Sequence, residues 1–313
     1  AQSVNPLDIA TMTRPGPYAV PAPSDDYWPG QESSYGRLTL NWDASENLSV
    51  KLKVSRTDYE SNSPSGAREL TYCGANNGVA QQGFPENDCV GDRVIAENPF
   101  PGKYAQSHSR MGRFGGALGE DFESTNITLS LDYTGENYDV VAYLNDHENE
   151  TYWVGDFDAG GLPNVMASEN NTFDSSSLEI RANSKFDGAL NFVAGIYMQD
   201  TDRFFGQDVM TATLMNTAAP QVGYIPGDYT HMLYDKRSES DGETSSLYFE
   251  VISDISDHTQ VTAGVRYIEE EKDSYFKQPY VNPAVLGLWI PASVGQIEAS
   301  QKHDDTVGEL TIR

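Results

Sequence analysis

The sequence is dominated by segments in which apolar and polar residues strictly alternate. In Leu38–Trp42 and Leu48–Val54, every second residue is Leu, Val or Trp, and the residues between them are Thr, Asn, Ser or Lys. A period of two is typical of β-strands with one apolar and one polar face. The pattern recurs in Ile127–Tyr133, Tyr138–Leu144, Leu178–Asn183, Leu190–Met198, Leu247–Val251, Val261–Tyr267 and Thr306–Ile312. We therefore predict an all-β chain of nine strands, in which Val209–Thr217 is the single candidate for a helix.

The connections between these strands alternate between short and long. The short ones are Asp43–Asn47, Gly135–Glu136, Asp187–Ala189 and Asp254–His258, and the long ones are Glu60–Asp121, Asn149–Thr172, Phe205–Glu243 and Asp273–His303. In an up-and-down sheet, every long connection then lies at the same end. Outer-membrane barrels show this asymmetry, and their tilted strands need about 9–11 residues to cross the bilayer. We therefore expect a portion of a transmembrane antiparallel β-barrel with short periplasmic turns and long extracellular loops.

The chain is strongly acidic. It has 47 Asp and Glu residues against 20 Lys and Arg residues, which gives a formal net charge of −27. Nucleic acid is excluded as a partner, because each phosphate contact needs a cation. Two interpretations of the excess acid stay open: it selects against anionic ligands, or it keeps extracellular loops soluble.

Motifs for catalysis or metal binding are missing from the sequence. The five histidines are scattered, and Gly-x-Ser-x-Gly, P-loop and HExxH patterns do not occur. We therefore expect a protein that is not an enzyme and that holds no metal and no cofactor.

The two cysteines, Cys73 and Cys89, lie within the longest connection, between residues 60 and 121. Their spacing of 16 residues in a segment rich in Gly, Asn and Gln matches no zinc motif. A disulfide that closes a surface loop in an oxidising compartment is favoured over two unrelated thiols.

Aromatic residues beside hydrogen-bonding groups form three clusters in or next to the long connections. The resulting candidates for ligand binding are Tyr152, Trp153, Asp156, Phe204, Phe205, Tyr224, Tyr229 and His231. Aromatic faces with adjacent polar groups suit glycans, siderophores and other flat, polar ligands. For the members next to the strand ends, the alternative is an aromatic belt where strands leave the membrane.

Several strand segments resemble TonB-dependent outer-membrane receptors. Phe192–Asp200, which follows a Phe186-Asp187-Gly188 turn, is similar to a barrel segment of that family. The hairpin Leu247–Tyr267, followed by the acidic run Glu269–Asp273, resembles the family's recurring barrel hairpin. Arg37–Asp43 fits the same pattern. The resemblance covers about residues 34–59 and 122–313.

This resemblance implies a receptor in the bacterial outer membrane that imports a scarce nutrient, such as a siderophore, a saccharide or cobalamin. The partners it implies are outer-membrane lipid, a small-molecule or oligosaccharide ligand, and TonB, reached through a plug that this chain does not contain. Residues 1–313 would then be about nine strands of a larger barrel. A passive outer-membrane porin and a secreted all-β protein that binds or cleaves polysaccharide remain as alternatives.

Overall fold

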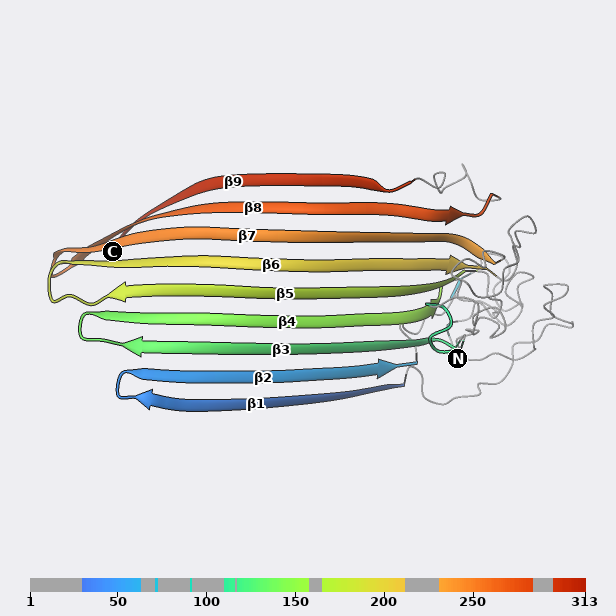
Figure 1. Cartoon of the computed structure of the whole chain (residues 1–313), viewed down its shortest axis with the longest axis horizontal. Coiled ribbons are helices and arrows are strands. Elements are labelled where there is room, and N and C mark those ends of the chain that lie inside the picture. The colour runs from blue at the N-terminus through green and yellow to red at the C-terminus, as the bar shows by residue number, and fades with distance from the viewer. Residues whose placement is uncertain are drawn as a thin grey trace, which may run out of the picture.

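The computed structural model describes residues 30–62, 71–72, 91, 110–115, 117–157, 165–211, 231–283 and 295–313, and its strands form a single antiparallel sheet (Figure 1). Its strands are β1 Gln31–Ser45, β2 Leu48–Ser61, β3 Gly119–Thr134, β4 Tyr138–Asp156, β5 Met166–Ser184, β6 Leu190–Met210, β7 Met232–Ser256, β8 Thr259–Val281 and β9 Ile297–Ile312. They follow one another across the sheet in sequence order. Within the described ranges, no helix is long and apolar enough to span a membrane.

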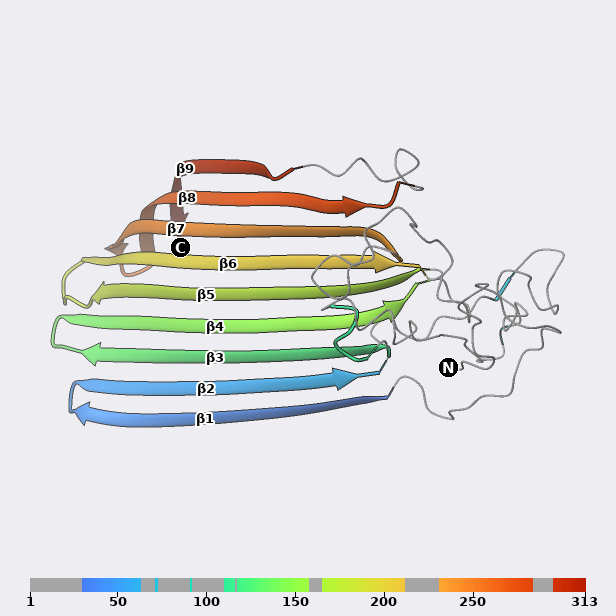
Figure 2. The ribbon, with the colours of Figure 1, turned by 45° about the vertical axis from the view of Figure 1, so that its right-hand side comes forward.

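The nine strands and their up-and-down order confirm the predicted fold. The four tight turns lie together at one end of the sheet, and the long connections leave from the other end (Figures 1 and 2). We refer to these two ends as the turn end and the loop end.

The strands are much longer than predicted. β7 has 25 residues and β8 has 23. Strands therefore take up 15 of the 24 residues of the expected loop Asn149–Thr172, 18 of the 39 of Phe205–Glu243 and 16 of the 31 of Asp273–His303. The prediction failed there because these extensions lack apolar alternation, the signal on which the strand limits were based. The helix candidate was wrong at its start, because Val209 and Met210 end β6, and residues 212–217 lie outside the described residues.

The register separates the sheet into an apolar and a polar face. Residues paired directly across neighbouring strands project to the same face. One such row across β1 to β8 is Trp42, Val50, Leu131, Ala142, Ile180, Ile196, Leu247 and Tyr267. The adjacent row is Asn41, Lys51, Ser130, Tyr143, Glu179, Tyr197, Ser246 and Ile268.

The apolar face does not pack into a closed core. Leu48, Val50, Leu52 and Val54 all lie on it, as the sequence predicted, and none belongs to a buried cluster of the described residues. Their neighbours on β1 are more than half exposed, with Trp42 at 66%. An extended exposed apolar face of this kind marks a surface that meets lipid or another partner.

The apolar band runs obliquely across the strands. The row through Leu129 is apolar from β1 to β6, but it reaches Ser245 on β7 and Glu269 on β8. On the apolar face of β9, the apolar residues are Leu310 and Ile312, which lie at the turn end. If the strands are tilted, an apolar band that runs parallel to the bilayer plane crosses them obliquely. Strands must be tilted in this way when a sheet closes into a barrel.

Exposure shows which way the sheet curves. On β4, the side chains of Asp146 and Glu148 on the apolar face are exposed, whereas Asn145, His147 and Asn149 on the polar face are half-buried. Side chains crowd on the concave side of a curved sheet, so the polar face is the inner one. We call it the lumen face and call the opposite face the outer face.

Most of the buried residues gather at the loop end, on both faces. On the outer face, residues 110–115 and 117–118, which we call the strap, lie across the ends of β3 to β7. The strap contributes Met111 to a fully buried cluster with Val154, Met166 and Met210. A second cluster, on the lumen face, contains Ala167, Val209, Leu233 and Val281.

Candidate functional site

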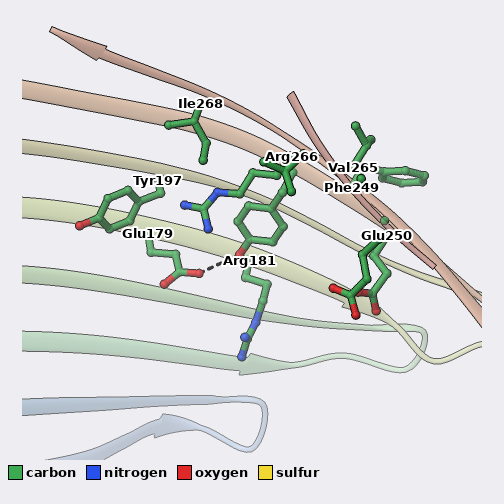
Figure 3. A pocket seen from close by; sticks show the side chains of 13 residues that line it. Glu179, Arg181, Tyr197, Phe249, Glu250, Val265, Arg266 and Ile268 are labelled. Atoms are coloured by element: carbon green, nitrogen blue, oxygen red, sulfur yellow. Dashed lines mark hydrogen bonds between the residues drawn. The ribbon is translucent and has the colours of Figure 1, made fainter. Parts of the chain in front are cut away.

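The lumen face carries a hollow of about 640 Å³ at the level of the apolar band (Figure 3). Glu179, Arg181, Tyr197 and Arg266 project around it from β5, β6 and β8. The Tyr248 hydroxyl donates to Glu179 at 2.7 Å. These side chains offer positive and negative charges and several hydrogen-bonding positions to any group that enters the hollow.

The Tyr248 ring lies over Gly195 on the neighbouring strand. A Cβ atom at position 195 would come within 2.3 Å of the end of this ring, so the ring keeps this position only beside glycine. The glycine therefore leaves room for Tyr248 to reach Glu179.

We expect Gly195→Ala to displace this ring and to lower the free energy of unfolding of the barrel by about 1–3 kcal/mol, the usual cost of overpacking. Urea unfolding in lipid vesicles measures this loss. The double variant Gly195→Ala/Tyr248→Ser should recover part of it, because the obstructing ring is gone. A loss that is as large in the double variant would refute the steric explanation.

A second polar and aromatic group lies on the lumen face nearer the loop end. Trp153, Glu169, Gln207 and Lys236 are paired in one row across β4 to β7. Gln207 donates to Glu169 at 3.0 Å and accepts from the Tyr234 hydroxyl at 3.1 Å. All five side chains are half-buried, which leaves part of each accessible from the lumen.

Lys236 connects this group to two aromatic rings. Its Nζ atom lies 5.5 Å from the ring centroids of both Phe205 and Tyr234. Burial, and then the nearby carboxylate of Glu169, raise the pKa of the Tyr234 phenol, so it stays a neutral donor at physiological pH. The arrangement can bind a polar ligand through donors, acceptors and ring faces together.

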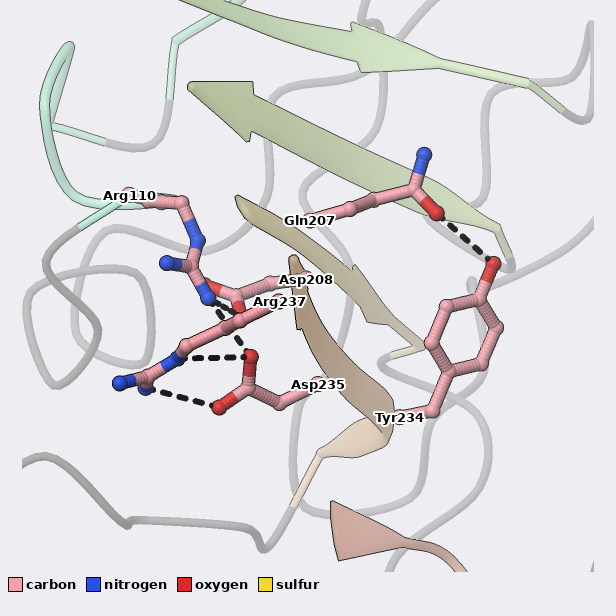
Figure 4. A network of polar contacts seen from close by, with 6 residues as sticks. All are labelled: Arg110, Gln207, Asp208, Tyr234, Asp235 and Arg237. Atoms are coloured by element: carbon pink, nitrogen blue, oxygen red, sulfur yellow. Dashed lines mark hydrogen bonds and ion pairs between the residues drawn. The ribbon is translucent and has the colours of Figure 1, made fainter. Parts of the chain in front are cut away.

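A buried ion-pair network holds the strap on the outer face (Figure 4). One guanidinium nitrogen of Arg110, Nη2, lies 2.6 Å from Asp208 on β6 and 2.7 Å from Asp235 on β7. Arg237 reaches the second oxygen of Asp235 at 2.9 Å. The Arg110 and Asp208 side chains are only 10% and 5% exposed, so water screens the pair little. Burial raises the pKa of Asp208 to about 6, although Arg110 opposes the shift.

We expect this network to make the loop end less stable as the pH rises. The folded pKa of Asp208, about 6, lies above its ordinary value of 3.8, so the folded state holds the proton more tightly. The resulting stabilisation is complete below pH 4 and is lost as the pH rises through 6. Hydrogen exchange at the loop end between pH 4 and 8 measures this, and Asp208→Asn should flatten the pH dependence. A slope that survives this substitution would show that another group titrates.

The structure separates the predicted ligand candidates between the two faces. Trp153 and Phe205 lie on the lumen face, whereas Tyr152, Asp156 and Phe204 lie on the outer face. Tyr152 packs edge-on against Phe114 of the strap, with the Arg113 guanidinium 4.5 Å from its ring. His231 is buried at the loop end, with Nδ1 3.2 Å from the Thr211 carbonyl oxygen.

Other predicted residues are not placed. Tyr224, Tyr229, Cys73 and Cys89 lie outside the described residues. Sequence reasoning missed Glu169 and Lys236, which fall in one row with Trp153 and Gln207 only through the register of four strands. Within the part of the chain that the structure describes, His, Cys, Asp and Glu side chains form no group able to hold a metal ion.

Comparison with known proteins identifies the fold. No protein-family model and no curated protein sequence matches the chain. Among solved structures, the ferric yersiniabactin uptake receptor FyuA from Yersinia pestis matches 90% of this chain at a TM-score of 0.59 and 12% identity. The ferric citrate transporter FecA matches 91% of it at a TM-score of 0.50 and 10% identity.

The sheet therefore has the fold of a TonB-dependent receptor barrel, a fold that resides in the outer membrane of Gram-negative bacteria. The chain spans about a third of the length of both matched proteins, 35% of FyuA and 34% of FecA. Both neighbours are named for uptake, FyuA as a receptor for ferric yersiniabactin and FecA as a transporter of ferric citrate.

Proposed function

We propose that this chain is part of the wall of a TonB-dependent outer-membrane receptor that imports a small nutrient. The observation that supports this proposal most strongly is that the strand register gives the sheet two different faces. The outer face carries an oblique apolar band and the lumen face is polar, and all tight turns lie at one end. A soluble secreted protein would have to cover the outer face. As part of this proposal, we expect the protein to have no enzymatic activity.

In this receptor, the whole chain, including the long connections, would belong to the barrel. Residues 1–313 would form barrel wall and extracellular loops, while a plug that contacts TonB and further strands would complete the receptor. The connection 60–121 would be extracellular and closed by a Cys73–Cys89 disulfide. Alkylation of the unreduced receptor should then label neither cysteine, and labelling of both would disprove the disulfide.

Two classes of ligand are consistent with this receptor function. The names of the structural neighbours point to ferric siderophores and ferric citrate. Saccharides are the other class that aromatic and polar lumen side chains can bind.

Deletion of the full-length gene tests the function. We expect loss of uptake of one nutrient, restoration by the gene, and no restoration in a strain that lacks TonB. Uptake that continues without TonB would indicate a passive porin instead.

A further inference from the structure

The lumen wall between the apolar band and the loop end is almost free of charge. Four consecutive lumen rows cross β3 to β7 here and contain twenty positions. Nineteen of the side chains are uncharged, with His taken as neutral, and the exception is Arg203. The positions are Phe122, Ser124, Asn126, Thr128, Asn145, His147, Asn149, Thr151, Asn171, Phe173, Ser175, Ser177, Gln199, Thr201, Arg203, Phe205, Ser238, Ser240, Gly242 and Thr244.

The outer face of the same strands has the opposite character. Three outer-face rows interleave with the four lumen rows, and ten of their fifteen positions are acidic while none is basic. The acidic residues are Glu123, Asp146, Glu148, Glu150, Asp174, Asp200, Asp202, Glu239, Asp241 and Glu243. The charge of this strongly acidic chain is therefore kept off the lumen wall, residue by residue along each strand.

The neutral wall is rich in hydrogen-bonding groups. Thr128 donates to the Asn145 side-chain oxygen at 2.9 Å, and Asn126 donates to the same oxygen at 3.2 Å. Further along, Gln199 donates to Ser175 at 3.0 Å. These amides and hydroxyls have more donor and acceptor positions than these contacts use, so they can also bind a ligand.

Aromatic rings lie at the loop-end side of this wall. Phe122, Phe173 and Phe205 are on β3, β5 and β6, and Trp153 on β4 occupies the next lumen row. All four are half-buried. Four successive strands thus each present one ring. Three of these rings lie beside neutral amides and hydroxyls, and Trp153 lies in a row with Glu169, Gln207 and Lys236.

We propose that this lumen wall binds a neutral oligosaccharide, a specification of the ligand that rests on the proposed receptor function. Sugar hydroxyls match Ser, Thr, Asn and Gln side chains, and the C–H faces of pyranose rings match aromatic faces. An anionic ferric chelate would need several cations. The four rows across β3 to β7 offer only Arg203, and the next row adds Lys236 together with the acids Glu120 and Glu169. An uncharged ligand leaves no charge to be paired, so the wall and the ligand are complementary.

Binding to the full-length receptor in detergent tests this inference. The probes are neutral hexasaccharides of α-glucan, β-glucan, xylan and mannan, with ferric citrate as the anionic comparison. We expect one hexasaccharide to bind with an affinity that stays within about twofold between 0.05 and 0.5 M NaCl, because salt screens only charged pairs.

Matched variants locate the site. Phe205→Ala should weaken binding about tenfold, whereas Phe204→Ala, next along β6 on the outer face, should change it less than twofold. Ser177→Glu on the lumen face should weaken binding more than Ser176→Glu on the outer face. Equal effects of the two variants within each pair would overturn the site.

The ligand class and the receptor function fail in different ways. Binding of ferric citrate without binding of any hexasaccharide would overturn the neutral ligand and leave the receptor function intact. Sugar uptake that needs no TonB would overturn the receptor function.

Discussion

Replacing Arg110 with Met is expected to detach the strap from the wall. The substitution leaves Asp208 buried without its cation, while Asp235 keeps only Arg237. Breaking one side of a buried ion pair costs about 3–5 kcal/mol, since the remaining charge stays desolvated. Limited proteolysis of the full-length receptor should then cut between residues 110 and 118, where the unaltered receptor resists.

Two further variants show whether burial explains this effect. Arg56→Met removes an ion pair with Asp58 and Glu123 on side chains that are 40–59% exposed, and it should leave protease resistance nearly unchanged because water screens exposed pairs. Arg110→Met/Asp208→Asn should recover much of the loss, because no uncompensated carboxylate remains on β6. Equal sensitivity of the Arg110 and Arg56 variants to protease would contradict the conclusion that the buried ion pairs of Arg110 hold the strap in place.

Replacing Ile196 with Arg is expected to have the second large effect. Ile196 lies in the apolar band, paired with Ile180 and Leu247, and its side chain is 39% exposed. A cation facing lipid near the bilayer centre costs about 2–4 kcal/mol. Urea unfolding of the full-length barrel in lipid vesicles should show that loss.

The adjacent residue provides the control. Tyr197 lies on the lumen face and is paired with Glu179, whose carboxylate can pair with an introduced cation. Tyr197→Arg should therefore cost less than 1 kcal/mol. A larger loss from Tyr197→Arg than from Ile196→Arg would mean that the two faces have been assigned in reverse.

The sequence predicts the strands well only within the apolar band. There, the sheet has one apolar and one polar face, and this produces the alternation seen in Leu48–Val54. Nearer the loop end, the alternation continues in another form. Ser238–Glu243 reads neutral, acidic, neutral, acidic, and Asp146–Glu150 shows the same period. Counting charge as well as hydropathy would have extended the strands.

Other features depend on contacts that no local pattern carries. Arg110 is 98 residues from Asp208 and 125 from Asp235, so its role depends on the path of the strap. The ligand-binding candidates predicted from the sequence were also separated by long-range pairing, onto the two faces of the sheet. Neighbouring aromatic residues such as Tyr152 and Trp153 lie on opposite faces, and only the register places Trp153 in one row with Gln207 and Lys236.

The orientation of the sheet is tested most directly by nitroxide labels placed one at a time along residues 48–54 of the full-length receptor in lipid bilayers. Cys73 and Cys89 would first be replaced by Ser. We predict high accessibility to oxygen, which partitions into lipid, at Leu48, Val50, Leu52 and Val54, and low accessibility at the three residues between them. Uniform accessibility, or maxima at the polar positions, would contradict an outer face turned toward the membrane.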